Sequence, residues 1–167
     1  FHLRYNIDRK FHDLEYIDKS IAVDASAIHQ NLKGLQWINR FNLNPENEIN
    51  TIKKALKIID NDKRKKVLIT HYQFVSTILN QDLNILNRWY LWDNNTHPTE
   101  NHKYFEFYKN MIKKNLTKNK IQVIYLLGQD NEILFKNIKN YFTNICFKSK
   151  TLETKRFSVH ELIVCKK

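Results

Sequence analysis

The sequence predicts an α/β fold: a small, mostly parallel sheet flanked by helices, with a C-terminal antiparallel hairpin at the sheet edge. Short apolar, β-branched runs at 67–70 and 121–127 are typical of buried parallel strands. Segments with apolar residues at helical spacing alternate with these runs. The last segment, 145–165, instead holds two strand-like runs joined by a polar turn, which predicts a hairpin.

Length and composition favour one domain over residues 1–167. The chain has 167 residues, of which 42% are hydrophobic, so it is large enough to bury a core. Its only glycines, Gly34 and Gly128, lie far apart, which excludes a P-loop and a dinucleotide-binding glycine motif. No run approaches 18 apolar residues, so the sequence predicts no membrane span within the chain itself.

The first part of the chain gives weaker signals than the rest. Residues 1–18 are expected to form an extended lead-in, followed by a short helix over 24–32 that Asp24 caps. A short strand is expected over 35–38.

A strong helix start follows at Asn44, Pro45 and Glu46, and apolar residues at helical spacing extend this predicted helix to about residue 60.

Further elements follow the strand at 67–70. A short helix is expected near Tyr72, and a strand near 85–90 leads into a loop. A longer helix is expected over 100–116, a strand over 121–127, and a helix from about Asp130 to Phe142. The hairpin strands are 145–148 and 157–165, joined by a turn around 150–155, which places Cys146 roughly opposite Cys165.

The chain is strongly basic, with 28 Lys and Arg against 17 Asp and Glu and a net charge of +11. This charge favours a partner that carries phosphates, such as nucleic acid, anionic lipid or a phosphate-linked substrate. The alternative is codon bias, because Lys, Asn and Ile are all abundant and all have A/T-rich codons. The basic runs at 63–66, 113–114 and 118–120 also sit at predicted helix ends, where cations offset the helix dipole.

The stretch from residue 88 to residue 97 is the main candidate site. It follows a predicted strand, on the side where α/β sheets place ligands. Aromatic faces stack on sugars, amides and Asp bind hydroxyls, and Arg binds a phosphate, so the stretch suits a sugar or phosphosugar. The alternative is that its aromatics only pack a core. The candidate ligand-binding residues are Arg88, Trp89, Tyr90, Trp92, Asp93, Asn95, His97 and, at the end of the strand at 67–70, His71.

Other chemistry receives little support. No pair of carboxylates fits acid/base work, and His97 and His102 lack the spacing and the cysteines of a metal site, so no catalytic residue, metal or cofactor is predicted. A general base at His71 is a further hypothesis. Cys146 and Cys165 either form a cross-strand disulfide in an oxidising compartment or stay reduced as small buried residues in the cytosol.

Several strings of the sequence resemble a known group of proteins. These strings are Arg9–Leu14, Asp24–Ser26, Lys33–Ile38, Thr70–Phe74, Asn87–Tyr90 and Asn101–Phe105. Through them the chain resembles the C-terminal soluble region of uncharacterised multi-spanning bacterial membrane proteins, which look like GT-C glycosyltransferases related to dolichyl-phosphate-mannose mannosyltransferases.

The resemblance implies a non-catalytic domain that follows a transmembrane helix and lies on the periplasmic side of the inner membrane. Its partners would be its own transmembrane region and a polyprenyl-phosphate sugar or a glycan acceptor. The family's catalytic Asp lies far upstream, so no catalytic residue transfers to this segment. The net charge of +11 is unusual outside the cytoplasm, although long domains translocate largely regardless of charge.

Two rival functions stay open at this point. A cytoplasmic nucleic-acid-binding module would show one contiguous basic face and salt-dependent binding. A small stand-alone enzyme would use His71 or His97 in a pocket shared with Arg88.

Overall fold

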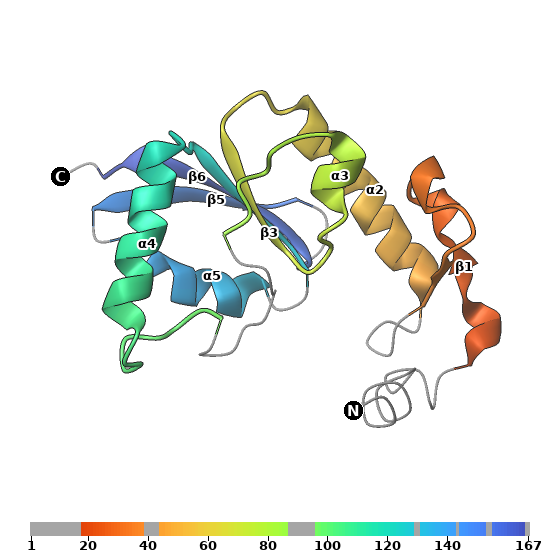
Figure 1. The fold of residues 1–167 in the computed structure, drawn as a ribbon, viewed down its shortest axis with the longest axis horizontal. Coiled ribbons are helices and arrows are strands. Elements are labelled where there is room, and N and C mark those ends of the chain that lie inside the picture. The colour runs from red at the N-terminus through yellow and green to blue at the C-terminus, as the bar shows by residue number, and fades with distance from the viewer. Residues whose placement is uncertain are drawn as a thin grey trace, which may run out of the picture. The chain divides into compact units, whose positions relative to one another are not determined.

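The computed structural model describes residues 18–38, 44–86, 96–128, 131–142, 144–152 and 155–165. The expected lead-in lies outside the described residues except for Asp18. The chain forms two compact units, residues 1–54 and 55–167. One long helix, α2 (Pro45–Asn61), runs through the boundary between them (Figure 1).

The first unit contains a two-stranded antiparallel sheet of β1 (Val23–Asp24) and β2 (Gln36–Trp37). Three short 3-10 turns accompany it: η2 (Lys19–Ile21), η3 (Ala25–Ala27) and η4 (Gln30–Leu32). The helix expected over 24–32 is therefore broken, because His29 between η3 and η4 is extended, with φ −160°. Asp24 does cap η3, since its carboxylate accepts the Ser26 backbone N–H at 2.7 Å.

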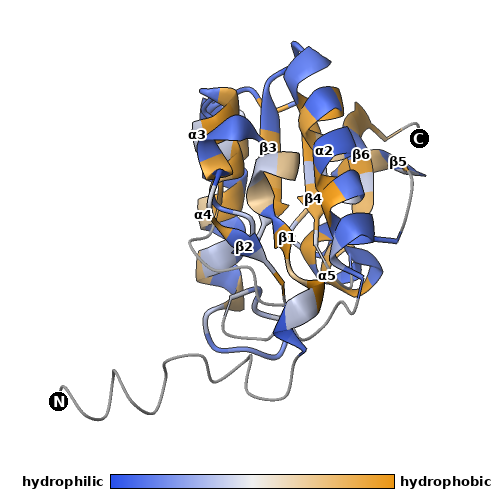
Figure 2. Ribbon diagram, turned by 90° about the vertical axis from the view of Figure 1, so that its right-hand side faces the viewer, coloured by the Kyte–Doolittle hydropathy of each residue, from blue (hydrophilic) through white to orange (hydrophobic). Residues whose placement is uncertain are grey.

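Helix α2 begins where the sequence places it. Asn44 Oδ1 accepts the Asn47 N–H at 3.1 Å, and Pro45 occupies the first helical position. The helix carries a continuous apolar stripe of buried side chains, and Figure 2 shows it as alternating hydrophobic and hydrophilic bands. The buried stripe consists of Ile49, Ile52, Ala55, Leu56 and Ile59.

The second unit is built on a four-stranded sheet of β3 (Lys66–Thr70), β4 (Val123–Leu127), β5 (Ile145–Thr151) and β6 (Phe157–Val164), in the spatial order β3-β4-β6-β5. Its helices in the described residues, besides the end of α2, are α3 (Val75–Leu79), α4 (Phe105–Lys118) and α5 (Asn131–Lys139). All residues of β3 and β4 are buried. Both strands are therefore covered on their two faces, although β3 lies at one end of the strand order.

The prediction of a mostly parallel sheet is wrong. Only β3 and β4 pair in parallel, with Lys66 opposite Val123 and Thr70 opposite Leu127. The pairs β4–β6 and β6–β5 are antiparallel, so the sheet is mixed. The hairpin is also not simply an edge, because β6 pairs with both β4 and β5 and is therefore internal. Only β5 lies at this edge, and its exposed second half bears Lys148 and Lys150.

The expected parallel sheet included a strand near 85–90, and the described part of that segment does not form one. Asn84 has a positive φ of 47°, which stops the chain from continuing in extended form, and residues 85–86 are not in a strand. The segment still covers the free edge of β3, because the carbonyl of Leu83 accepts the Leu68 N–H at 3.0 Å. Residues 87–90 lie outside the described residues.

Helices α4 and α5 cover one face of the main sheet. Alternate side chains of the two parallel strands belong to one hydrophobic cluster with these helices: Val67 and Ile69 in β3, and Ile124 and Leu126 in β4. The helices contribute Phe105, Ile112, Leu116, Leu134 and Ile138 to this cluster. None of the helices in the described part of the chain combines the length and the hydropathy that a membrane crossing requires.

Candidate functional site

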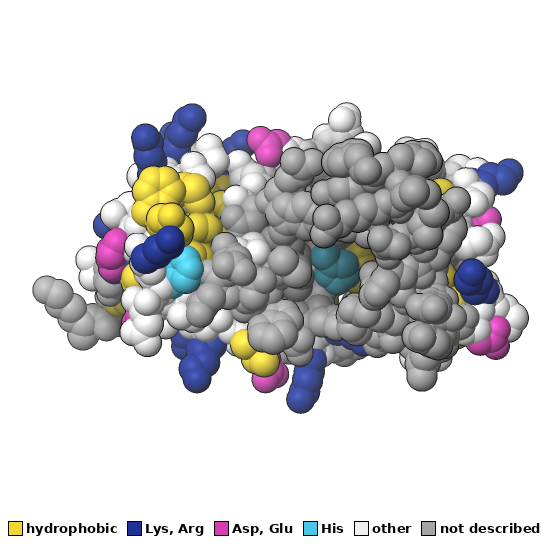
Figure 3. Space-filling model, turned by 60° about the horizontal axis from the view of Figure 1, so that its bottom comes forward, with side chains coloured by type: hydrophobic (Ala, Val, Ile, Leu, Met, Phe, Trp, Pro, Cys, Tyr) yellow, Lys and Arg dark blue, Asp and Glu magenta, His cyan; other side chains and the backbone are white. Residues whose placement is uncertain are grey.

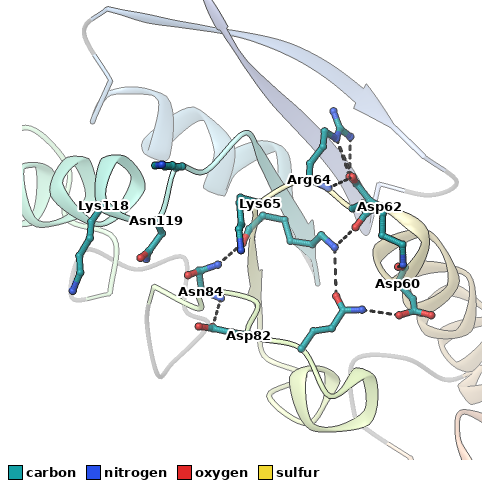
Figure 4. A pocket seen from close by; sticks show the side chains of 12 residues that line it. Asp60, Asp62, Arg64, Lys65, Asp82, Asn84, Lys118 and Asn119 are labelled. Atoms are coloured by element: carbon teal, nitrogen blue, oxygen red, sulfur yellow. Dashed lines mark hydrogen bonds and ion pairs between the residues drawn. The ribbon is translucent and has the colours of Figure 1, made fainter.

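A polar pocket of about 560 Å³ lies at the sheet edge where β3 and β4 begin (Figure 4). Because these strands are parallel neighbours, the turns that precede them meet at this edge. The lining residues come from the α2–β3 turn (60–66), the segment after α3 (81–84) and the α4–β4 turn (118–120). Figure 4 shows Lys118 and Asn119 on one side of the pocket and Asp60 and Asp62 on the other.

The lining of this pocket is net positive. Six lining residues are cationic and three are acidic, which gives a formal charge of +3. The C-termini of α2 and α4 adjoin the pocket, and each contributes roughly −0.5 of an elementary charge. The two helix ends together offset only about one positive charge, so the pocket still favours an anion.

The amine of Lys66 is held by hydrogen bonds within the protein. Its ammonium group donates to the carbonyl of Ile59 at 2.9 Å, to the carbonyl of Asp62, and to Gln81 Oε1 at 3.4 Å. These bonds satisfy carbonyls at the C-terminus of α2, which would otherwise lack partners. Burial lowers the pKa of Lys66.

Asp62 and Arg64 form the centre of an ion-pair network across the sheet. The guanidinium of Arg64 donates to Asp62 Oδ2 at 2.8 Å and to Glu161 Oε1 in β6 at 2.9 Å. The Tyr125 hydroxyl in β4 donates to Asp62 Oδ2 at 2.7 Å. Burial raises the pKa of Asp62, but hydrogen bonds from Arg64 and Tyr125 outweigh burial and lower that pKa to about 2. The network therefore joins the α2–β3 turn to β4 and β6.

The substitution Asp62→Asn should destabilise the protein by about 2 kcal/mol at neutral pH, since the pKa is about 2 in the fold and 3.8 ordinarily. Because the folded-state pKa is depressed, this contribution is present above pH 3.8 and is lost as the pH falls towards 2. Urea unfolding across this pH range measures it. Asp82→Asn, which alters an exposed carboxylate of the same pocket, is the control and should change stability little. Equal effects of the two substitutions would refute the role of the network.

Three amines of the pocket remain available to a ligand. Lys65, Lys118 and Lys120 are exposed, and their side chains make no hydrogen bond or ion pair with any residue that the structure describes. By contrast, Lys63 donates to the carbonyl of Asp60 at 3.2 Å. Lysine side chains that line a hollow of this size can bind a phosphate or a carboxylate.

The predicted site at residues 88–97 is only partly visible. Arg88, Trp89, Tyr90, Trp92, Asp93 and Asn95 lie outside the described residues, so their proposed ligand contacts stay a prediction. His97 is only 1% exposed, and its ring packs edge-on against Tyr108 of α4 at 6.2 Å between centroids. His71 is exposed directly after β3, with its ring against Tyr72. Neither histidine lines the polar pocket.

The polar pocket could have been found in the sequence. Two of its walls are the basic runs 63–66 and 118–120, which each precede a strand by a few residues. Each run alone is explained by a helix end. The missing step was to combine them: if the strands at 67–70 and 121–127 pair in parallel, the two runs must meet at one edge.

Cys146 and Cys165 are joined by a disulfide, with their Cα atoms 5.0 Å apart, within the usual range for disulfides. The bond links the start of β5 to the end of β6.

Among the described residues, no group of three His, Cys, Asp or Glu side chains is placed to hold a metal ion. Comparison with family models, with curated proteins and with solved structures gives no match for this chain.

Proposed function

We propose that this chain is a non-catalytic domain that binds a phosphate-bearing ligand. The polar pocket carries this proposal: Lys65, Lys118 and Lys120 belong to the lining of a hollow of about 560 Å³, and that lining is net positive. Asp62, Arg64 and Lys66 already have protein partners, so the proposal assigns them to holding the pocket in shape.

We further propose that the domain is the extracytoplasmic C-terminal part of a membrane glycosyltransferase-like protein. In that setting the phosphate belongs to a lipid-phosphate-linked sugar or its acceptor. The sequence resemblance supports this setting, and so does the disulfide, because disulfides persist in oxidising compartments such as the periplasm. The domain would then help to position the lipid-linked substrate for a catalytic centre elsewhere in the protein.

A charge-matched pair of triple variants tests the binding site. The variant Lys65→Gln, Lys118→Gln, Lys120→Gln removes the three available amines. Its control, Lys136→Gln, Lys148→Gln, Lys150→Gln, removes three exposed lysines from α5 and β5 and so changes the net charge equally. The probes are inorganic pyrophosphate, followed by calorimetry, and phosphatidylcholine vesicles with or without undecaprenyl phosphate, followed by co-sedimentation.

The pocket variant should bind both phosphate probes at least about tenfold more weakly than the control, since one charge-assisted hydrogen bond contributes about 1.5 kcal/mol. Raising the salt concentration should weaken binding by the wild type. Equal loss in the two triple variants would show non-specific charge attraction and would refute the pocket. Tighter binding of a single-stranded oligonucleotide than of either phosphate probe would favour the nucleic-acid alternative.

A further inference from the structure

A second hollow lies at the beginning of α4. It shares no lining residue with the polar pocket, and its lining is mainly aromatic. Its volume is about 460 Å³, and it is lined by Pro98, His102, Tyr104, Phe107 and Tyr108. Tyr104 is 55% exposed and Phe107 is 71% exposed, although large aromatic side chains are usually buried. Figure 3 shows hydrophobic side chains gathered beside a histidine and bordered by Lys and Arg, on the side of the molecule where α4 lies.

Interior packing does not require these two aromatic rings. The inward side of α4 is already formed by Phe105, Ile112 and Leu116, which are buried in the hydrophobic cluster. Tyr104 and Phe107 lie three positions apart, on one face of the helix, and so present neighbouring rings to the hollow. Tyr104 is additionally held by Lys103, whose amine lies 4.8 Å from the centroid of the Tyr104 ring.

The polar groups around the hollow are suited to hydroxyls. His102 accepts the Tyr104 backbone N–H through Nδ1 at 3.3 Å, which orients its imidazole ring at the rim of the hollow. The tyrosine hydroxyls and the Lys103 amine add hydrogen-bonding groups beside the apolar ring faces. A pyranose ring has the matching surface, because it combines apolar C–H faces with a rim of hydroxyls.

Charge and size favour a small molecule over an anionic membrane as the occupant of this surface. Around the first turn of α4, the cations Lys103 and Lys109 are balanced by Glu100 and Glu106, so an anionic membrane gains little attraction here. The volume falls within the range of about 300–1,000 Å³ that is typical of small-molecule sites.

We propose that the aromatic hollow formed by Pro98, His102, Tyr104, Phe107 and Tyr108 is a binding site for the ring of a neutral pyranoside. Tyr104 and Phe107 stack on the C–H faces of the sugar, and the rim groups bind its hydroxyls. This site uses none of the residues of the polar pocket, so it stands or fails separately from the proposed phosphate binding.

Saturation-transfer NMR with methyl glucoside, methyl mannoside, methyl galactoside and their disaccharides tests the proposal. Saturable transfer to at least one pyranoside is expected, and Phe107→Leu or Tyr104→Leu should weaken binding about threefold to tenfold. Leucine keeps an apolar side chain but removes the aromatic face. Tyr104→Phe should retain most of the binding, and Ile133→Ala, at an exposed apolar position on α5, should change nothing.

Two results would overturn the proposal. One is the absence of saturable transfer from the wild-type chain to any of the pyranosides. The other is binding to phosphatidylglycerol or phosphatidylcholine vesicles that survives Phe107→Leu, because a lipid surface accepts any apolar side chain at that position. Failure of the phosphate probes alone would leave the sugar result unaffected, and the reverse also holds.

Discussion

Removing the Cys146–Cys165 disulfide should lower the free energy of unfolding by about 3 kcal/mol, because the bond closes a loop between cysteines 19 positions apart. The constraint acts mainly on the unfolded chain, whose entropy rises when the loop opens. The loop contains the whole of β6 and most of β5, so loss of the disulfide bond should loosen this edge of the sheet before the rest of the fold. Chemical unfolding of Cys146→Ala/Cys165→Ala, with and without a reductant, measures the effect.

Comparison with and without the reductant distinguishes the contribution of the disulfide bond from that of the cysteine side chains. Wild-type protein should lose about as much stability on reduction as the double variant loses by substitution, and the double variant itself should not respond. Identical unfolding midpoints for oxidised and reduced wild type would show that the bond contributes nothing. Mass spectrometry after thiol alkylation of cells tells which form exists in vivo, and free thiols there would remove the structural support for an extracytoplasmic location.

Local sequence signals predicted most helices and strands from α2 onwards, because each signal depends on near neighbours. Asn44 and Pro45 fix the start of α2, and the β-branched apolar runs mark β3 and β4. Topology depends on which strands become neighbours, and alternation of helices and strands gives no direct information on that. The order β3-β4-β6-β5 follows from backbone pairing between distant segments: β6 pairs with both β4 and β5, which gives it an internal position.

The sites show the same division between local and non-local information. The sequence drew attention to the aromatic and polar stretch at 88–97, where chemistry-bearing residues are adjacent along the chain. The polar pocket instead unites basic turns more than fifty positions apart, and only the parallel pairing of β3 with β4 brings them together. The sequence does not indicate the aromatic hollow for another reason. Tyr104 and Phe107 belong to a predicted helix, and helical spacing alone does not tell that both rings stay exposed side by side.

The sequence also gives no sign that His160 is buried, and this burial makes the stability of the fold strongly dependent on pH. His160 in β6 is 5% exposed, with Nε2 lying 2.9 Å from Ser158 Oγ and Nδ1 lying 2.9 Å from Ser149 Oγ. The Phe135 ring of α5 stacks on the imidazole at 3.4 Å between centroids. Burial lowers the pKa of His160 to about 4, so the fold holds a neutral ring between two hydroxyls.

The protein should lose about 3 kcal/mol of stability between pH 6.5 and pH 4, since His160 has an ordinary pKa of 6.5 and a folded pKa of about 4. The unfolded chain takes up its proton first, so stability is full above pH 6.5 and falls as the pH is lowered. This window lies above that of Asp62, whose contribution is lost only between pH 3.8 and about 2, so the two groups are distinguishable.

His160→Gln should abolish most of this pH dependence, because an amide can still bond to Ser149 and Ser158 but does not titrate in this range. Urea unfolding at closely spaced pH values compares the slopes of wild type, His160→Gln and the control His102→Gln. NMR of the imidazole protons should show the neutral form of His160 persisting to near pH 4 in the folded state. A wild-type slope that His160→Gln leaves unchanged would assign the acid sensitivity to other groups. A flattened slope would make the Ser149–His160–Ser158 contact the main acid-sensitive point of the sheet, at the hairpin that the disulfide also holds.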